Sequence, residues 1–499
     1  MTGRGVLASA GLAAGLCLLH FAAFDVRKQP LVWDARFYCY FAARVAAGDV
    51  PYRDFFDNKT PLAVLAGGAL YQIGTRLGVD PVYTMRGGFL CFSAIAALLA
   101  FGVQRWLAGG RATPGLLGLL ALLGFPLLGL LPSIGVLPKL LMATAAWATA
   151  LCVARGRFRL AGAAGALAFL DWQIGALALL GALAAALSLR RGRWPALLQV
   201  AGGALAAWAP FVLYLAGVGG LGPACRQTLA TMLVRGEGPW WMHRTLPERL
   251  AYLWDSVDVG CRGHQWLFAL GIVGMGLFVI RLMRRWPHPQ RPALICLAAY
   301  HYGVVGFSLY DYQSYGDLFI LLHSVAFFAG FVFVEAWRQL AVALRRRAGA
   351  RLWASRAAVL TTLLLVRPGP FQRELDLRPP SADRGATLDE QRAVARRVMA
   401  QVGERRLAAL NASEVLMLSG RPSALPFVYW NSATYHFYRR SADEGYVQTL
   451  MRLARSQGVD TLIGDRTLLP RPGDKLVASE TGAYSVVLRP IRRAGPTIQ

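Results

Sequence analysis

Residues 32–62 contain three motifs, Val32-Trp33-Asp34-Ala35-Arg36-Phe37-Tyr38, Gly48-Asp49-Val50-Pro51-Tyr52-Arg53-Asp54 and Asp57-Asn58-Lys59-Thr60-Pro61-Leu62. Apolar residues recur with helical spacing after Asp34, and Gly48 closes this pattern. Thr60-Pro61 is a favourable start for a second helix over residues 61–78, because proline is tolerated at the first helical position. We therefore expect two short amphipathic helices on a membrane surface, joined by a polar turn.

The composition indicates an integral membrane protein. Of the 499 residues, 56% are hydrophobic and the mean hydropathy is +0.41, whereas soluble domains contain roughly 45–50% apolar residues. Many apolar segments are long enough to cross a hydrocarbon core of roughly 30 Å. About eleven transmembrane helices are expected, at residues 5–24, 84–104, 114–131, 139–154, 159–172, 174–189, 195–216, 265–283, 292–310, 316–336 and 352–367.

The distribution of charge predicts the orientation of these helices. The net charge is +26, yet the short loops of one side carry arginines and almost no acidic residues, while the acidic residues fall on the other side. Short loops rich in basic residues face the cytoplasm. The pattern therefore favours a cytoplasmic N-terminus and argues against nucleic-acid binding. Residues 25–80, 217–264 and 368–499 should then lie outside the membrane on the opposite, external face.

The Arg-rich composition also indicates the compartment. Only four of the 53 basic residues are lysines, and no retention signal is present, so we expect a bacterial inner (plasma) membrane with a periplasmic external face. The first apolar segment should be retained as a membrane span, because no small-residue cleavage pattern follows it. Cys225 and Cys261 share one external loop, where a disulfide and two free thiols are equally compatible with their spacing.

The C-terminal region has a different character, because charge rises after a proline-rich linker at residues 368–380. Alternating helical and strand patterns predict a small external α/β domain of roughly 130 residues. The expected helices are Leu388–Leu410 and Glu444–Gln457, and the expected strands are Glu414–Leu418, Thr461–Gly464, Val477–Ser479 and Tyr484–Leu488.

Asp34 has two interpretations from its position alone. Aspartate is a preferred N-cap residue, so Asp34 could simply cap the helix that follows it. It could also be a functional carboxylate at the edge of the membrane. Lys59 and Arg36 are likewise either solvated anchors of the membrane surface or cations that bind an anionic head group.

The three motifs together resemble those of the membrane-embedded GT-C glycosyltransferases. The similarity is strongest to the branch of the protein O-mannosyltransferases, the lipid A aminoarabinose transferase and bacterial family 39-type enzymes. It covers roughly residues 5–340 and is strong over 30–65. The resemblance implies that Asp34 is the catalytic carboxylate, and that Lys59-Thr60-Pro61 matches a Lys-Pro-Pro-like motif at the start of the second juxtamembrane helix. It also implies a membrane catalytic module over residues 1–367, followed by a periplasmic domain over residues 368–499.

Other candidate substrate-binding residues are supported less directly. The segment 165–173 resembles one in which many relatives carry a lysine, but Asp171 and Gln173 stand here, which puts that lysine's phosphate role in doubt. Ionisable groups at the ends of spans are functional candidates by default, or else ordinary edge charges. Glu237 and His243 lie near Trp240-Trp241, but two ligands without a third do not make a metal pattern. The remaining candidates are Tyr38, Asp57, Asp311, Gln313 and Asp317.

The resemblance implies a simple reaction. Asp34 would take a proton from an acceptor hydroxyl as its oxygen attacks the anomeric carbon of a polyprenyl-phosphate sugar, with inversion. Lys59, Arg36 and Arg53 would bind the phosphate that leaves. No cofactor is required on this scheme, and a divalent metal has no support. The expected partners are the lipid-linked donor, a glycan, lipid or protein acceptor, and membrane lipids, but no nucleic acid.

Two alternatives remain open. A transporter or flippase of lipid-linked glycans would usually show related halves and paired broken helices, and the sequence shows no internal repeat. An O-antigen ligase or polymerase would carry its important residues in a late, large external loop, whereas the richest segment here is the first loop.

Overall fold

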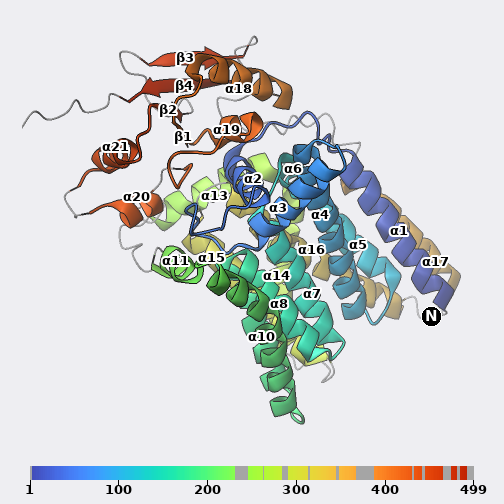
Figure 1. Ribbon diagram of the computed structural model, residues 1–499. Coiled ribbons are helices and arrows are strands. Elements are labelled where there is room, and N and C mark those ends of the chain that lie inside the picture. The colour runs from blue at the N-terminus through green and yellow to red at the C-terminus, as the bar shows by residue number, and fades with distance from the viewer. Residues whose placement is uncertain are drawn as a thin grey trace, which may run out of the picture.

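The computed structural model describes residues 3–230, 245–261, 263–283, 290–312, 315–343, 348–366, 387–429, 432–440, 444–464, 474–479 and 484–491. These residues form a large helical bundle with a small sheet at one end (Figure 1). The helices of the bundle are α1 (Gly3–Ala22), α2 (Trp33–Ala46), α3 (Leu62–Arg76), α4 (Pro81–Leu107), α5 (Ala112–Leu123), α6 (Leu127–Ile134), α7 (Pro138–Ala154), α8 (Phe158–Asp171), η1 (Gln173–Gly175), α9 (Ala176–Leu187), α10 (Arg193–Gly217), α11 (Leu221–Cys225), η2 (Arg226–Ala230), α13 (Leu246–Cys261), α14 (Gln265–Met283), α15 (Arg291–Tyr310), α16 (Tyr315–Ala343) and α17 (Ala348–Val366).

Each segment expected to cross the membrane is largely helical where the structure describes it, although the segment 114–131 is interrupted at residues 124–126, between α5 and α6. Within the part of the chain that the structure describes, five helices are long and apolar enough to span a membrane, in α4, α10, α14, α15 and α16. The pair α5 and α6 makes a sixth if its 58° bend lies within one span. α1, α7 and η1–α9 contain shorter apolar helices. The expected number of eleven spans therefore stays a prediction.

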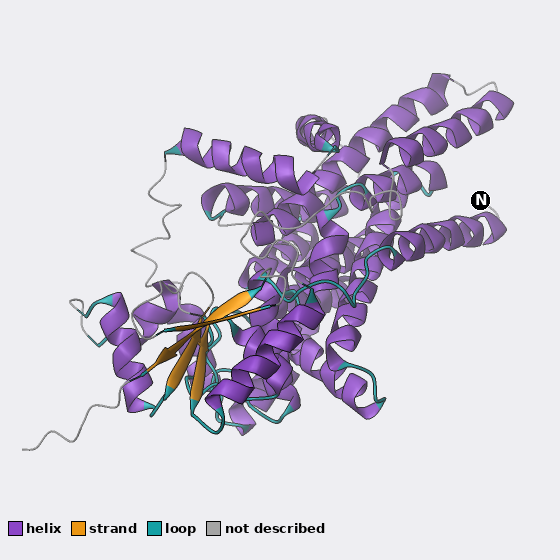
Figure 2. Ribbon diagram, turned by 90° about the horizontal axis from the view of Figure 1, so that it is seen from above, coloured by secondary structure: helices purple, strands orange, loops and turns teal. Residues whose placement is uncertain are grey.

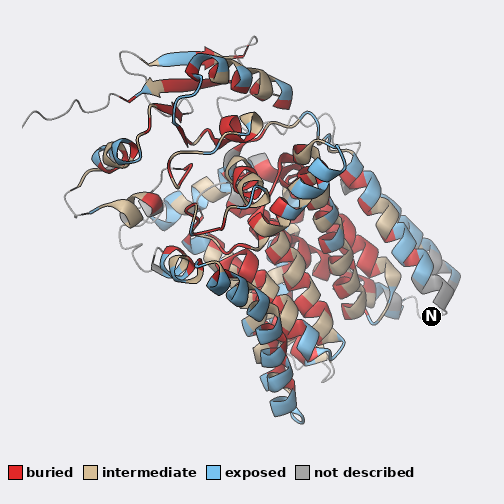
Figure 3. Ribbon diagram, in the orientation of Figure 1, coloured by how far each residue is buried: buried red, intermediate tan, exposed pale blue. Residues whose placement is uncertain are grey.

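The burial of the long helices agrees with a lipid environment. α16 lies at the centre of the bundle, and 89% of its apolar 18-residue stretch is buried. α10 instead exposes an apolar outer face that includes Leu198, Leu205 and Leu213 (Figure 3). A contiguous apolar face of this kind needs a partner other than water, and lipid chains supply it.

Two glycines let α8 and α10 approach at backbone distance. A Cβ atom on Gly203 would lie 1.9 Å from the carbonyl oxygen of Arg159, and one on Gly162 would lie 2.0 Å from that of Val200. Small residues permit such close packing between membrane helices. This contact holds α8, and therefore the loop that follows it, against its neighbour.

We expect Gly203→Ala to destabilise the bundle, because the added methyl group must push two helices apart. The expected cost is about 1–3 kcal/mol, seen as a lower melting temperature of the purified protein in detergent. Gly202→Ala is the matched control, because a Cβ atom there meets nothing within 4 Å. An equal effect of the two substitutions would contradict this account of the helix contact.

The C-terminal residues form an α/β arrangement, as the sequence predicts. A four-stranded sheet has the order β1-β2-β4-β3, in which β1 and β2 are parallel and the other pairs are antiparallel (Figure 2). The expected boundary at residues 367–368 falls at the edge of a segment outside the described residues. The elements are α18 (Leu388–Val402), β1 (Leu407–Leu410), α19 (Ser413–Ser419), α20 (Ser432–Tyr438), α21 (Tyr446–Ser456), β2 (Thr461–Gly464), β3 (Lys475–Ala478) and β4 (Ser485–Pro490).

Two secondary-structure predictions in this region are wrong. The helix expected over Leu388–Leu410 ends at Val402, because Gly403 adopts φ +56°, and Leu407–Leu410 forms the buried strand β1. The strand expected at Glu414–Leu418 is the helix α19, which Gly420 ends in a left-handed conformation. Short apolar runs fit a buried strand and a buried helix equally well, so periodicity could not separate them.

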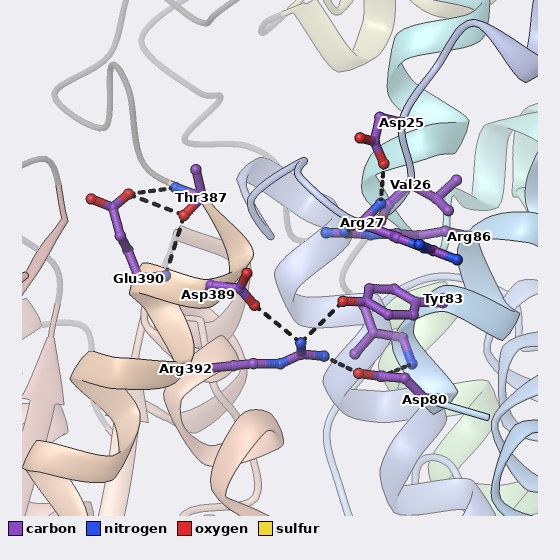
Figure 4. Close-up of polar contacts among 11 residues, drawn as sticks. Asp25, Val26, Arg27, Asp80, Tyr83, Arg86, Thr387, Asp389, Glu390 and Arg392 are labelled. Carbon is purple, nitrogen blue, oxygen red and sulfur yellow. Dashed lines mark hydrogen bonds and ion pairs between the residues drawn. The ribbon is translucent and has the colours of Figure 1, made fainter. Parts of the chain in front are cut away.

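The C-terminal part docks on the end of the bundle that carries α2 and α3. The Gln391 side chain accepts a hydrogen bond from the Leu31 amide at 2.7 Å and donates one to the Leu31 carbonyl at 3.0 Å. Arg392 of α18 pairs with Asp80 and donates to the Tyr83 hydroxyl at 3.2 Å, both at the start of α4 (Figure 4). The first loop and the C-terminal part therefore lie at the same end of the bundle.

Candidate active site

Asp34 lies in the first turn of α2 with a half-exposed side chain. The helix begins at Trp33 with Val32 as its N-cap residue, and no side chain caps it. The capping interpretation of Asp34 is therefore wrong. The side chain is 52% exposed, so its carboxylate remains accessible at the end of the bundle on which the C-terminal part docks.

Lys139 and Asp317 approach Asp34 from two other helices. Lys139 is the second residue of α7, and Asp317 lies in the first turn of α16. The Lys139 ammonium donates to Asp317 Oδ1 at 2.7 Å and lies 3.9 Å from Asp34 Oδ2. Three segments far apart in the sequence thus bring two carboxylates to one buried ammonium.

Trp172 brings a second lysine into the group. The Lys59 ammonium lies 4.9 Å from the centroid of the Trp172 ring, and the Lys139 ammonium lies 5.1 Å from the same centroid. Trp172 is buried in extended conformation at the break between α8 and η1, which turns its ring out of the helical path. Cations on an aromatic face are stabilised by the ring quadrupole, so one indole holds both ammonium groups within about 10 Å of each other.

The loop before α3 fixes the backbone of Lys59. The Lys59 amide donates to Asp57 Oδ1 at 2.9 Å, and the Lys59 carbonyl accepts from the Tyr52 hydroxyl at 2.7 Å. The neighbouring Asn58 carbonyl accepts from Gln173 at 2.7 Å. The candidate residue Gln173 therefore holds the Lys59 loop against η1.

Asp57 is buried beneath this loop, with 1% of its surface exposed. Burial raises the pKa of its carboxyl to about 7, against smaller opposing contributions from the amide and ammonium groups of Lys59. A carboxyl whose pKa is raised by folding stabilises the folded state most at low pH, and this stabilisation is lost as the pH rises toward the folded pKa.

We expect Asp57→Asn to stabilise the protein at pH 8 more than at pH 5. The asparagine keeps an oxygen for the Lys59 amide but carries no charge, so it removes a penalty of up to about 4 kcal/mol at alkaline pH. Melting temperatures of both proteins across this range measure the effect. Asp25→Asn, at an exposed aspartate of the same loop, should show no such trend. If the difference in melting temperature between Asp57→Asn and the wild type stayed the same from pH 5 to pH 8, the prediction would be contradicted.

Asp171 has a structural contact. It is fully buried, and its Oδ2 accepts a hydrogen bond from the Met142 amide at 2.7 Å, which ties the end of α8 to the first turns of α7. The buried side chain therefore positions α7, the helix that carries Lys139.

The remaining candidates differ in their contacts, and one of them, Asp311, interacts electrostatically with Lys139. Arg53 pairs with Asp54 and donates to the Val218 carbonyl at 3.0 Å, and Arg36 lies 5.0 Å from the Phe37 ring centroid. Tyr38 and Asp311 are buried. Glu237, His243 and Gln313 lie outside the described residues.

Two further observations concern the cysteines and possible metal ligands. Cys225 and Cys261 are both free thiols in this structure. Among the residues that the structure describes, no three His, Cys, Asp or Glu side chains group in a way that could hold a metal ion.

A separate cavity of about 660 Å³ lies between α2, α3 and α19. Its walls include Arg44, Arg76 and Arg421, and Asp34, Lys59, Lys139 and Trp172 do not line it. The cavity is therefore distinct from the group around Trp172, and the C-terminal part supplies one of its walls.

Comparison with known proteins identifies the fold. No protein-family model and no curated protein sequence matches the chain. The crystal structure of ArnT from Cupriavidus metallidurans bound to undecaprenyl phosphate is similar, with a TM-score of 0.58 and 15% identity over 98% of both chains. The same protein in the apo state gives a TM-score of 0.58 and 16% identity over 98% of both chains. The whole chain thus shares its fold with these solved structures.

Proposed function

We propose, on the premise that this chain has the GT-C fold, that it transfers a sugar from a polyprenyl-phosphate donor to an acceptor hydroxyl. The observation that carries the proposal is the half-exposed Asp34 carboxylate, which lies 3.9 Å from the Lys139 ammonium, and the Trp172 ring that Lys139 shares with the Lys59 ammonium. A base and a cationic site for a phosphate are the two elements that this reaction needs.

Asp34 acts as the general base in this proposal. The acceptor oxygen attacks the anomeric carbon and gives its proton to the Asp34 carboxylate. The bond between the anomeric carbon and the phosphate oxygen breaks, and the polyprenyl phosphate leaves as a stable anion, so no acid partner is needed. A single displacement of this kind inverts the anomeric centre.

Lys59 is the best-placed cation for the phosphate, because its backbone is fixed and its ammonium lies on Trp172. A preorganised cation stabilises the charge that develops on the leaving group. Arg36, two residues from Asp34 on α2, is a second candidate. Arg53 would have to leave Asp54 and the Val218 carbonyl before it could contribute.

The class of donor is supported by the structural likeness. The similar ArnT structure is bound to undecaprenyl phosphate, so a chain with this fold can present a site to a polyprenyl phosphate. The apolar outer faces of the helices give the lipid tail of such a donor a suitable environment.

The proposed location follows from charge and architecture together. The arginine-rich loops put the N-terminus in the cytoplasm, and α2, α3 and the C-terminal part share one end of the bundle. We place this end in the periplasm and the chain in a bacterial inner membrane. Transfer would then occur on the periplasmic face.

The direct test uses the purified chain in liposomes with a panel of labelled polyprenyl-phosphate sugars and envelope glycans as acceptors. Release of free polyprenyl phosphate together with a new glycosidic bond, measured by mass spectrometry, is the expected result. Nuclear magnetic resonance of the product should show an inverted anomeric configuration. Movement of the lipid-linked sugar between leaflets without release of polyprenyl phosphate would support a flippase and contradict the proposal.

A further inference from the structure

Lys139 occupies an uncommon position for a lysine in a membrane protein. Only 8% of its side chain is exposed, and its ammonium lies between oxygens of Asp317 at 2.7 Å and Asp34 at 3.9 Å. Asp311 also interacts electrostatically with it. A buried charge of this kind is retained only when it is paired, and here carboxylates on two separate helices supply the pairing.

The two carboxylates are not equivalent. Asp317 makes the short contact and is almost as buried as Lys139, at 11% exposed, whereas Asp34 is 52% exposed. The close ion pair with Asp317 offsets the free-energy cost of burying the Lys139 ammonium. One Asp34 oxygen therefore faces the Lys139 ammonium, and the exposed part of the Asp34 side chain is accessible to a substrate.

Two carboxylates that face a common point usually share a cation, and divalent ions such as Mg²⁺ and Mn²⁺ bind through one or two carboxylates and waters. Between Asp34 and Asp317 the Lys139 ammonium already supplies a positive charge. An arriving divalent ion would meet the ammonium at close range, and the repulsion between like charges is strong away from bulk water.

We propose that Lys139 is a built-in cation that takes the place of a divalent metal ion between Asp34 and Asp317. Lys139 is a positioning residue, since it orients the Asp34 carboxylate beside the donor phosphate. This inference rests on the proposed glycosyl transfer, and it adds that the transfer runs without a bound metal ion.

The closing experiment measures metal binding and sugar transfer separately. Wild type, Lys139→Ala and Lys59→Ala are purified with chelator, and Mn²⁺ binding is followed by electron paramagnetic resonance. Transfer is then assayed with EDTA or with Mn²⁺. Lys59→Ala is the matched control, because it removes the other ammonium from Trp172 but leaves Lys139 between the carboxylates.

We expect the wild type to be unaffected by EDTA and to bind no stoichiometric Mn²⁺. Lys139→Ala should lose roughly 100-fold in turnover, gain one Mn²⁺ site, and recover at least tenfold with Mn²⁺. Lys59→Ala should be impaired without recovery. Lys139→Arg, which keeps the positive charge, should retain at least roughly a tenth of the turnover and stay resistant to EDTA.

Three results would overturn the inference while leaving glycosyl transfer intact. The first is a wild type that needs a divalent ion, and the second is a folded Lys139→Ala protein that neither binds Mn²⁺ nor is rescued by it. The third is a folded Lys139→Arg protein as inactive as Lys139→Ala. If Lys139→Ala does not fold, the measurements on the wild type and on Lys139→Arg still test the inference. A wild type that transfers no sugar from any donor would instead contradict the proposed function itself.

Discussion

Replacing Asp34 by asparagine is expected to lower the turnover of sugar transfer by roughly 10²–10⁴-fold, the usual contribution of a general base. Asparagine has nearly the same shape but cannot accept a proton from the acceptor hydroxyl. It also keeps an oxygen that Lys139 can face. The fold should survive, because Asp34 caps no helix and is half-exposed. Turnover with a saturating donor measures the loss, and the melting temperature in detergent reports on folding.

The matched control for this substitution is Asp25→Asn in the same loop. Asp25 is 47% exposed, and its ion-pair contact is with Lys28, whose side chain is also exposed, so the pair contributes little. We expect this variant to keep the full rate. If Asp34→Asn transferred sugar within threefold of the wild type, Asp34 would not be the base, and the mechanism proposed here would fail.

Much of the site's framework was predictable from local patterns. The helix after Asp34 and the helix after Thr60-Pro61 both appear, as α2 and α3. The capping interpretation failed by two positions, because Val32 is the N-cap residue and Asp34 is the second residue of the first turn. Helix starts are uncertain by one or two residues from sequence alone, and at Asp34 that difference separates a structural carboxylate from an accessible one.

Lys139 was missed because its contacts join residues far apart in the chain. No sequence pattern indicates that α7 and α16 both begin beside α2. Two signals were nevertheless present. Lysine is rare in this chain, with four among 53 basic residues, and Lys139 stands at the end of an apolar segment. An ionisable residue at that position is a functional candidate.

Asp171 and Gln173 have structural contacts that the sequence did not predict. Both were candidates for substrate binding because they stand where many relatives carry a lysine, yet each makes a contact that holds another segment in place. Asp171 orients the first turns of α7, and Gln173 holds the loop of Lys59. In the structure a cation is supplied near Trp172 from α7 instead. A local sequence comparison cannot detect a charge that arrives from another helix.

Lys59→Ala is expected to lower kcat/KM for the polyprenyl-phosphate donor by roughly 10²–10³-fold, the loss seen when one preorganised electrostatic contact is removed. The ammonium would contact the phosphate in both the bound donor and the transition state, and its charge counts most as the phosphate leaves. We therefore expect KM to rise and kcat to fall. Lys59→Arg should restore only part of the activity, because a planar guanidinium on a fixed backbone cannot present its charge as a compact ammonium does.

Initial rates over a range of donor concentrations separate these two effects for each variant. Lys28→Ala is the control, because Lys28 lies in the same external loop with 83% of its side chain exposed. Loss of positive charge alone should not matter at that position. If Lys59→Ala altered only the KM of the acceptor and left the donor parameters unchanged, the lysines on Trp172 would bind the acceptor. The leaving phosphate would then have to be held elsewhere, with Arg36 as the nearest remaining candidate on α2.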